Sequence, residues 1–168
     1  CLDSGWVSSV GAYVDQFEAA LSELTGVAHA VATVNGTAAL HAALLVAGVK
    51  PGDEVLLPAL TFIGTANPVA AMGATAHFVD CAPDTLGVDP DALARHLGDT
   101  TQMRDGVCFN RLSGRPIKAL LVTHVLGHIC DMERLCEVAR HHALVVIEDA
   151  AEALGSYRNG HHAGHWGQ

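Results

Sequence analysis

Basic residues are scarce in this 168-residue sequence, which holds nine lysines and arginines against eighteen aspartates and glutamates and carries a formal net charge of −9. Proteins that bind the phosphate backbone of nucleic acids cluster lysine and arginine on one surface. The charge balance therefore argues against a nucleic-acid partner. No uncharged apolar run is long enough to cross a bilayer, so we expect no membrane-spanning segment.

Several familiar signatures are also missing. The first residues, "CLDSGWVSS", contain no Met, basic region or apolar stretch, which is unlike a signal peptide, and we expect the chain to be part of a longer one. The P-loop pattern and G-x-G-x-x-G are absent, which disfavours nucleotide binding of those two kinds. Five cysteines form no C-x-x-C pair, so we expect reduced thiols in a cytoplasmic protein. They are Cys1, Cys81, Cys108, Cys130 and Cys136.

The eleven histidines raise the alternative of a zinc site. Six potential ligands lie close together in the sequence, and "HHAGH" lies near its end. The six are His124, His128, Cys130, Cys136, His141 and His142. Their spacing matches no zinc signature, so we expect no metal site.

Short apolar runs alternate with helical patterns in a chain that is 50% hydrophobic and long enough for one domain with a substantial core. The pattern predicts an α/β fold with a largely parallel, buried sheet. Residues 99–116 are polar and contain glycine, which predicts an exposed excursion. The expected strands are 30–34, 54–57, 75–79, 117–125 and 143–149. The expected helices are 13–26, the segment from Asn35 or Thr37 to Gly48, 61–72, the segment opening at 89–93, and 131–142.

Ligands of parallel sheets gather beyond the carboxyl ends of the strands, and the unusual polar residues of this chain follow its predicted strands. In "VNGTAAL", Gly36 and Thr37 open a helix whose N–H groups and hydroxyl could hold a phosphate, although an ordinary helix cap explains them equally well. Phe62 follows the next strand and could stack on a planar ring, or be a common core residue.

The stretch "LVVIEDAAEALGS", residues 144–156, ends an apolar strand with Asp149. A carboxylate at this place costs desolvation energy unless a partner compensates its charge. The protonated ring nitrogen of pyridoxal phosphate is such a partner, because an aspartate keeps it protonated and able to withdraw electrons.

Four stretches carry a resemblance to a known family. They are "GWVSSVGAYVDQFE", "VATVNGTAALHAALLVAGVKPGDEVLLPALTFIGTAN", "HFVDCAPDTLGVDPDAL" and "VVIEDAAEALGSYRNGHHAGHWG". The chain resembles the DegT/DnrJ/StrS family of nucleotide-sugar aminotransferases, which are pyridoxal-phosphate enzymes of the aspartate-aminotransferase fold type. Within that family it is most similar to the branch of legionaminic-acid-type sugar biosynthesis. The resemblance implies a three-layer α/β/α large domain.

The resemblance also implies roles for single residues. Gly36 and Thr37 match the phosphate-binding turn, Phe62 the aromatic that stacks on the cofactor ring, and Asp149 the partner of the ring nitrogen. Glu152 falls near the cofactor's 3-hydroxyl, where many members carry glutamine.

Two further polar residues lie at these strand ends. His124 begins the family's H-x-x-G segment and is a candidate contact for cofactor or substrate. Glu148 points the opposite way along its strand from Asp149 and is expected to be structural.

The catalytic lysine of such an enzyme forms a Schiff base with the cofactor, and this chain lacks it. The sequence contains only Lys50, in a turn, and Lys118, at the start of a strand. The family places its lysine shortly beyond the segment that matches "HHAGHWG". We therefore expect residues 1–168 to be a partial cofactor-binding large domain, without the C-terminal small domain.

The implied parent enzyme is a cytoplasmic homodimer. It transfers an amino group, from a donor such as glutamate, to a keto group of a nucleotide-linked deoxysugar used for surface polysaccharide or legionaminic-acid-type sugars. Two alternatives stay open. Some relatives replace the lysine by histidine and dehydrate the sugar, and a non-catalytic binder of sugar or cofactor could share this fold.

Overall fold

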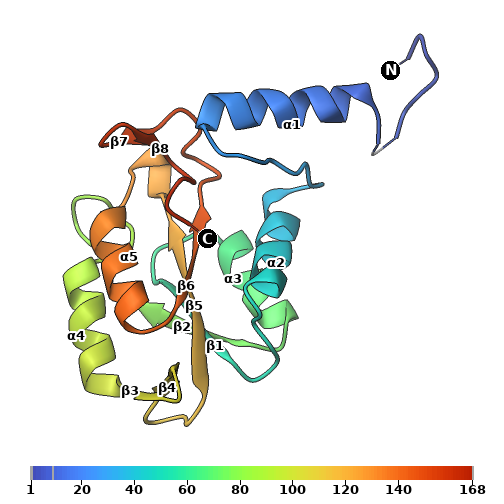
Figure 1. Cartoon of the computed structure of the whole chain (residues 1–168). Coiled ribbons are helices and arrows are strands. Elements are labelled where there is room, and N and C mark those ends of the chain that lie inside the picture. Colours follow the sequence, from blue (N-terminus) through green and yellow to red (C-terminus); the bar gives the residue numbers. More distant parts are fainter. Residues whose placement is uncertain (1, 9, 168) are drawn as a thin grey trace.

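The computed structural model describes residues 2–8 and 10–167, which include a six-stranded mixed sheet between two pairs of helices (Figure 1). A separate two-stranded sheet consists of β7 (Tyr157–Arg158) and β8 (His161–His162). The parallel strands lie in the order β2-β1-β5-β6, and the hairpin β3–β4 pairs antiparallel with the start of β5. The strands are β1 (Glu54–Pro58), β2 (Thr75–Val79), β3 (Thr101–Arg104), β4 (Val107–Asn110), β5 (Pro116–Thr123) and β6 (Val145–Asp149). The mostly parallel α/β sheet expected from the sequence is confirmed.

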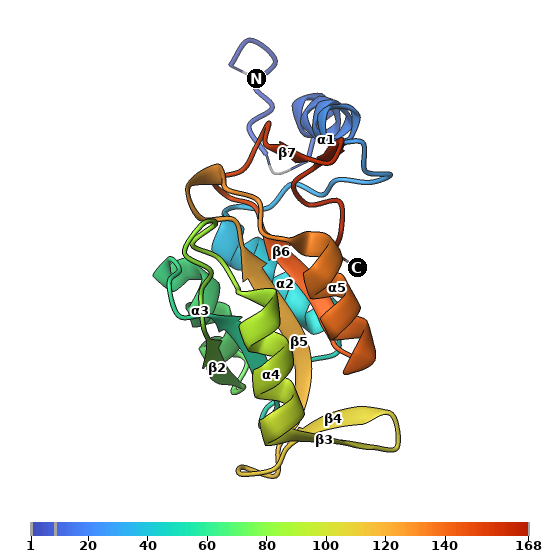
Figure 2. The same ribbon diagram turned by 90° about the vertical axis from the view of Figure 1, so that its left-hand side faces the viewer.

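Helices cover both faces of the sheet (Figure 2). On one face lie α2 (Gly36–Val46) and α3 (Ile63–Ala71), and on the other lie α4 (Pro90–Thr100) and α5 (Met132–His141). None of the helices in the described part of the chain is long and apolar enough to cross a membrane.

Alternate residues of each strand face opposite helix pairs, as the pleat of a sheet requires. Leu56 and Leu120 pack toward α4 and α5, whereas Val55, Leu57 and Leu121 pack toward α2 and α3. All five are fully buried, and each contributes about 1.5–3 kcal/mol by leaving water. The two apolar clusters hold the strands in register, and so fix the edge where the strands end.

The predicted strand over 30–34 is wrong. Within the described residues this segment pairs with no strand, and the side chains of Val31 and Val34 are 80% and 89% exposed. A strand needs a neighbour whose backbone completes its hydrogen bonds. Here the Ala32 N–H donates instead to the side chain of Glu18, over 2.7 Å.

The exposed excursion predicted for 99–116 is also wrong in part, because it contains the β3–β4 hairpin. Thr101 and Cys108 are buried, and Cys108 faces the core. Asp105 and Gly106 form the two-residue turn, both with positive φ (50° and 77°). The dipeptide Asp-Gly is a strong hairpin signal that our reading of the sequence overlooked.

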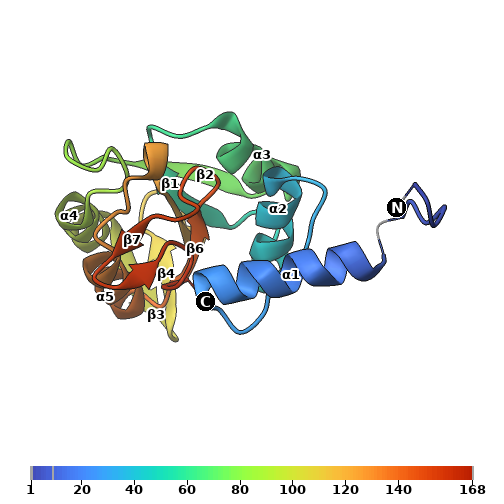
Figure 3. The same ribbon diagram turned by 90° about the horizontal axis from the view of Figure 1, so that it is seen from above.

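The predicted N-terminal helix forms as α1 (Ala12–Thr25) and ends at the expected cap, Gly26, whose φ is 76°. The helix extends past the rest of the molecule (Figure 3) and has no buried residue. The side chains of Tyr13 and Phe17 are 65% and 55% exposed. These side chains form an apolar face of α1 that no described segment covers.

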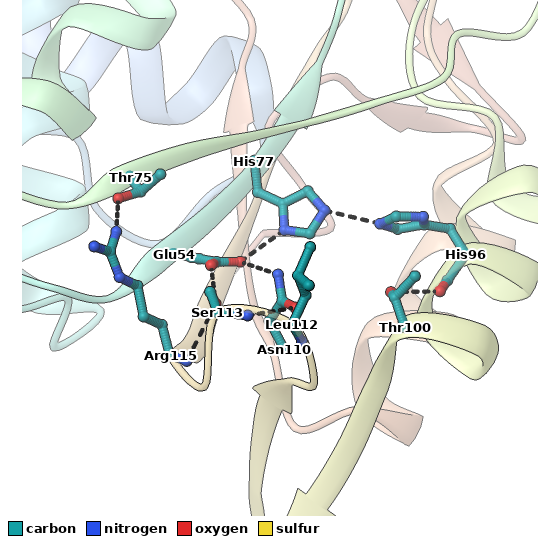
Figure 4. Close-up of polar contacts among 9 residues, drawn as sticks. All are labelled: Glu54, Thr75, His77, His96, Thr100, Asn110, Leu112, Ser113 and Arg115. Carbon is teal, nitrogen blue, oxygen red and sulfur yellow. Dashed lines mark hydrogen bonds and ion pairs between the residues drawn. The ribbon is translucent and has the colours of Figure 1, made fainter.

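A polar network closes the amino end of the sheet (Figure 4). The Glu54 carboxylate is nearly buried and accepts hydrogen bonds from His77 Nδ1 over 2.8 Å, Asn110 Nδ2 over 2.9 Å and the Ser113 hydroxyl. Each carboxylate oxygen therefore has a partner, which a buried charge requires. The network ties β1 to β2 and to the loop that follows β4.

Candidate functional site

A cavity of about 490 Å³ opens beyond the carboxyl ends of β1, β5 and β6. Its lining comes from the loop before α3, from the turn after β5 and from the residues at and after the end of β6. The lining residues are Leu60, Thr61, Phe62, Thr123, His124, Val125, Leu126, Asp149, Ala151 and Glu152. The structure therefore brings together four of the residues predicted for the site: Phe62, His124, Asp149 and Glu152.

Asp149, the last residue of β6, presents its carboxylate to this cavity. Its Oδ2 accepts a hydrogen bond from the Thr65 hydroxyl over 2.6 Å, and its Oδ1 accepts a long one, 3.3 Å, from the Ala151 N–H. The ion pairs among the described residues do not include Asp149. The carboxylate thus has neutral donors at its back and an open cavity in front, which suits a cationic ligand group.

Phe62 is an exposed cavity wall, with 76% of its surface accessible, so the alternative of an ordinary core phenylalanine is wrong. It immediately precedes α3 and caps it without a side-chain hydrogen bond. Its flat apolar ring is available to stack on a planar ligand.

Gly36 and Thr37 do not line the cavity but adjoin it at the start of α2. The Asn35 side chain caps that helix by accepting from the Ala38 N–H over 2.8 Å. The Thr37 hydroxyl lies beside Phe62, because a β-carbon at Gly64 would be only 3.1 Å from that hydroxyl and 3.0 Å from the Phe62 ring. The amino ends of α2 and α3 therefore meet next to the cavity, where the N–H groups of a helix terminus can hold a phosphate.

His124 touches the cavity, but both of its ring nitrogens have protein partners. Nε2 donates to Glu148 over 2.9 Å, and Nδ1 accepts from the Cys130 N–H over 3.4 Å. The imidazole is fully buried. We infer that His124 presents ring carbon to a ligand rather than a free acid or base.

Glu148 has the structural position expected of it. It accepts hydrogen bonds from the backbone N–H groups of Gly164, Trp166 and Gly167 as well as from His124. Burial opposes ionisation of this carboxyl, but the hydrogen bonds, led by the one from His124, outweigh it and lower its pKa. Glu148 therefore anchors the last described turn to the sheet.

Glu152 accepts a hydrogen bond from the Leu126 N–H over 2.7 Å. Leu126 has a positive φ of 52°, which a leucine adopts only when its surroundings hold it there. One oxygen of Glu152 thus fixes the turn after β5, and the carboxylate remains exposed at the cavity.

The sequence analysis missed three threonines at the site: Thr61, Thr65 and Thr123. Their hydroxyls form a hydrogen-bonded row that ends on Asp149. The spacing of four between Thr61 and Thr65 at a helix start, and a threonine at the end of β5, were the available signals.

The two lysines lie away from the cavity. Lys50 is exposed in the turn before β1, and Lys118 is near the start of β5, so both are at the amino ends of strands. Across residues 2–8 and 10–167, no group of three or more His, Cys, Asp or Glu side chains could hold a metal ion.

Another cavity, of about 350 Å³, lies at the N-terminal segment, between Trp6 and Tyr13. Residues 4–14 alone supply its described lining, and none of these lining residues is a carboxylate, an imidazole or an amine. The cavity at Asp149, which is lined by ionisable side chains, is therefore the better candidate for a functional site.

The chain is similar to known proteins over nearly all of its length. The DegT/DnrJ/EryC1/StrS aminotransferase family matches residues 1–168. The GDP-perosamine synthase of Caulobacter vibrioides is 43% identical over 99% of this chain and 41% of its own length. Among solved structures, DesV from S. venezuelae has a TM-score of 0.82 and 34% identity, covering 97% of this chain and 39% of its own. NtdA from Bacillus subtilis with bound cofactor PMP has a TM-score of 0.79 and 33% identity, covering 96% and 33%.

This chain thus spans about two fifths of the length of the curated relatives it matches. Those relatives contain more chain than is described here.

Proposed function

Because the chain belongs to the DegT/DnrJ/EryC1/StrS aminotransferase family, we propose that the whole protein is a pyridoxal-phosphate-dependent sugar aminotransferase and that residues 1–168 form part of its cofactor-binding large domain. The observation that carries the proposal is the Asp149 carboxylate, which faces a cavity bounded by an exposed aromatic ring and adjoined by two helix amino ends. A cavity of this size accommodates a small cofactor, since such sites span about 300–1,000 Å³.

The residues present fit pyridoxal phosphate. Asp149 would pair with the ring nitrogen and hold its proton, and Phe62 would stack on the ring. The amino end of α2, with Gly36 and Thr37, would hold the phosphate, and Glu152 would lie near the ring hydroxyl. When bound, the cofactor supplies the carbonyl carbon and electron-withdrawing ring on which amino groups are exchanged.

The described residues place no lysine at the cavity, so we propose that this chain alone binds the cofactor without a covalent bond and does not turn over. The expected substrate of the whole protein is a nucleotide-linked deoxysugar with a keto group, and the expected donor is an amino acid such as glutamate. The name GDP-perosamine synthase, borne by relatives at 43% and 39% identity, supports a nucleotide-linked sugar. The legionaminic-acid-type branch stays a prediction.

Two further features belong to this proposal. The uncovered apolar face of α1 supports a homodimer, in which a second copy would bury it. Cys81, Cys108, Cys130 and Cys136 are all free thiols, which supports a cytoplasmic protein.

Cofactor binding is tested by titrating pyridoxamine 5′-phosphate into the 168-residue chain in a calorimeter. This probe has no aldehyde and so cannot react with Lys50 or Lys118. Asp149→Asn should weaken binding by about tenfold or more, because it removes a charged hydrogen bond. Asp105→Asn, in the exposed hairpin turn, is the matched control and should bind as the wild type does. Equal affinity for the Asp149→Asn and wild-type chains, or no binding at all, would contradict the proposal.

The reaction is tested in the whole protein with a nucleotide-linked keto sugar and glutamate, followed by mass spectrometry of both products. Transamination replaces the keto oxygen by an amino group and converts glutamate into 2-oxoglutarate. Loss of water from the sugar without consumption of glutamate would instead identify a dehydratase. Neither product would favour a non-catalytic binder.

A further inference from the structure

Three threonine hydroxyls and the Asp149 carboxylate form one continuous row of hydrogen bonds beside the cavity. The Oγ1 atoms of Thr123 and Thr61 are 2.9 Å apart, as are those of Thr61 and Thr65, and Thr65 Oγ1 lies 2.6 Å from Asp149 Oδ2. The four residues come from the end of β5, the loop after β1, the first turn of α3 and the end of β6. The row therefore links three strand ends and one helix.

The direction of every bond in this row follows from counting protons. A hydroxyl has one proton to donate, and an ionised carboxylate can only accept. Since Thr65 gives its proton to Asp149, its oxygen must accept from Thr61. Thr61 has then used its own proton and must accept from Thr123. All three hydroxyls thus point their protons toward Asp149.

Thr65 lies in the first turn of α3. Threonine side chains often bond to backbone groups near them in the sequence. Thr65 instead reaches across to β6, 84 positions along the chain, and is fully buried. Away from water, a hydrogen bond to a charged group is stronger, and each donor polarises the next.

We propose that Thr65 is a positioning residue that holds the Asp149 carboxylate in one orientation, with Thr61 and Thr123 as the donors behind it. The inference rests on the proposed function for the identity of the ligand. Thr65 occupies Oδ2 at the back of the carboxylate. Oδ1, which accepts only the long Ala151 contact among the described residues, is then the oxygen that meets the cationic ring nitrogen.

The test compares Thr65→Val, which keeps the shape and removes the donor, with Thr65→Ser, which keeps the donor. Pyridoxamine 5′-phosphate labelled with ¹⁵N in its ring is titrated into each 168-residue chain. Thr65→Val should bind about tenfold more weakly, because Asp149 can then leave the orientation that meets the ring nitrogen. Its bound ligand should show the ¹⁵N signal of a ring nitrogen that has lost part of its proton. Thr65→Ser should restore both the affinity and the signal.

Thr101→Val is the matched control. Thr101 is likewise buried and donates a hydroxyl hydrogen bond of 2.6 Å, to the Leu97 carbonyl, but it lies on β3 at the other end of the sheet. It should change neither readout. If Thr65→Val does not fold, Thr61→Val serves in its place. That variant removes the donor to Thr65 and should produce a smaller change in the same direction.

The outcomes separate this inference from the proposed function. If Asp149→Asn weakens binding while Thr65→Val or Thr61→Val leaves affinity and ¹⁵N signal unchanged, the positioning role is wrong and the cofactor site stands. If Thr65→Ser behaves like Thr65→Val, the hydroxyl is not the cause. If the wild-type chain does not bind the probe, the proposed function itself fails.

Discussion

The imidazole rings of His77 and His96 meet edge to face, with their Nε2 atoms 2.8 Å apart (Figure 4). His77 Nδ1 donates to the buried Glu54 carboxylate, so in neutral His77 the Nε2 atom is an acceptor. His96 must then donate from its own Nε2. Two fully protonated rings would bring two N–H groups together, and the contact would break.

Acid should therefore destabilise the chain through this pair. Burial, and next the charge of His77, lower the pKa of His96 below its ordinary 6.5. A group with a depressed folded pKa contributes its stability above the unfolded value and loses it as the pH falls through the folded value. Thermal unfolding should thus show a melting temperature that is constant above about pH 6.5 and falls by several degrees as the pH drops below that value.

His96→Gln should flatten this part of the profile, because glutamine does not titrate. His29→Gln, at an exposed histidine outside the helices and strands, is the control and should keep the wild-type slope. The nearby carboxylates Asp80 and Asp99 raise the pKa of His96 and work against the effect. Equal slopes for the His96→Gln and wild-type chains would show that the pair does not sense pH.

Protonation of Glu54 should cause a second loss of folding stability in acid. Burial raises the pKa of this carboxyl, but hydrogen bonds from Ser113, Asn110 and His77 outweigh it, so the pKa lies below the ordinary 4.5. Its stabilising contribution is complete above about pH 4.5 and disappears as the carboxyl protonates at lower pH. Glu54→Gln should lower the melting temperature at neutral pH. The difference from the wild type should shrink in acid.

The buried carboxylate of Glu148 should be among the most important for stability. Its side chain is 2% exposed and accepts four hydrogen bonds, including that of His124. Glu148→Ala leaves these donors unpaired and should cost about 3–5 kcal/mol in urea unfolding. Amide exchange at Gly164 and Gly167 should accelerate, since Glu148 accepts from both.

Glu137→Ala is the matched control for that experiment. Glu137 pairs with Arg134 on the exposed side of α5, and surface ion pairs contribute little. Its removal should leave both urea unfolding and amide exchange almost unchanged. If both variants lost a similar free energy of unfolding, the buried Glu148 would contribute no more to stability than the exposed Glu137.

Much of the fold could be predicted because the spacing of apolar residues within a short stretch of sequence indicates a strand or a helix. Leu56 and Leu120 belong to short apolar runs bounded by turn residues, which marks them as strand residues without knowledge of their neighbours. Residues 30–34 have an equally apolar pattern, but a strand exists only if another strand pairs with it. That information lies elsewhere in the chain, and the prediction failed there.

The candidate site could likewise be predicted only in part. Asp149 and Phe62 could be found because each follows a strand and bears a chemically distinctive group. Thr65 was harder to find, because its spacing of four from Thr61 is a weak signal and a threonine in an alanine-rich helix is otherwise unremarkable in the sequence. Its role depends on contact with a residue 84 positions away, which only the folded chain reveals.

The uncovered face of α1 should make the chain associate with itself. Tyr13 and Phe17 on α1, and Trp6 in the segment before it, are all more than half exposed, and an apolar patch of this kind is a common association surface. Sedimentation velocity should show an average mass that rises with concentration. Phe17→Glu should reduce the rise, whereas Gln16→Glu, next to it but polar already, should not. A concentration-independent monomer would contradict this expectation.

Glu152 should tolerate replacement by glutamine. Its structural task is to accept the hydrogen bond of the Leu126 N–H over 2.7 Å, and a glutamine carbonyl oxygen can accept the same bond. Glu152→Gln should therefore bind pyridoxamine 5′-phosphate within about twofold of the wild type, because an exposed carboxylate contributes little through charge alone. Glu152→Leu removes the acceptor, releases the strained turn at Leu126 and should weaken binding more. If Glu152→Gln weakened binding while Asp149→Asn bound as the wild type does, the negative charge of Glu152 would be the group that the ligand requires, and the assignment of Asp149 as partner of the ring nitrogen would have to be reversed.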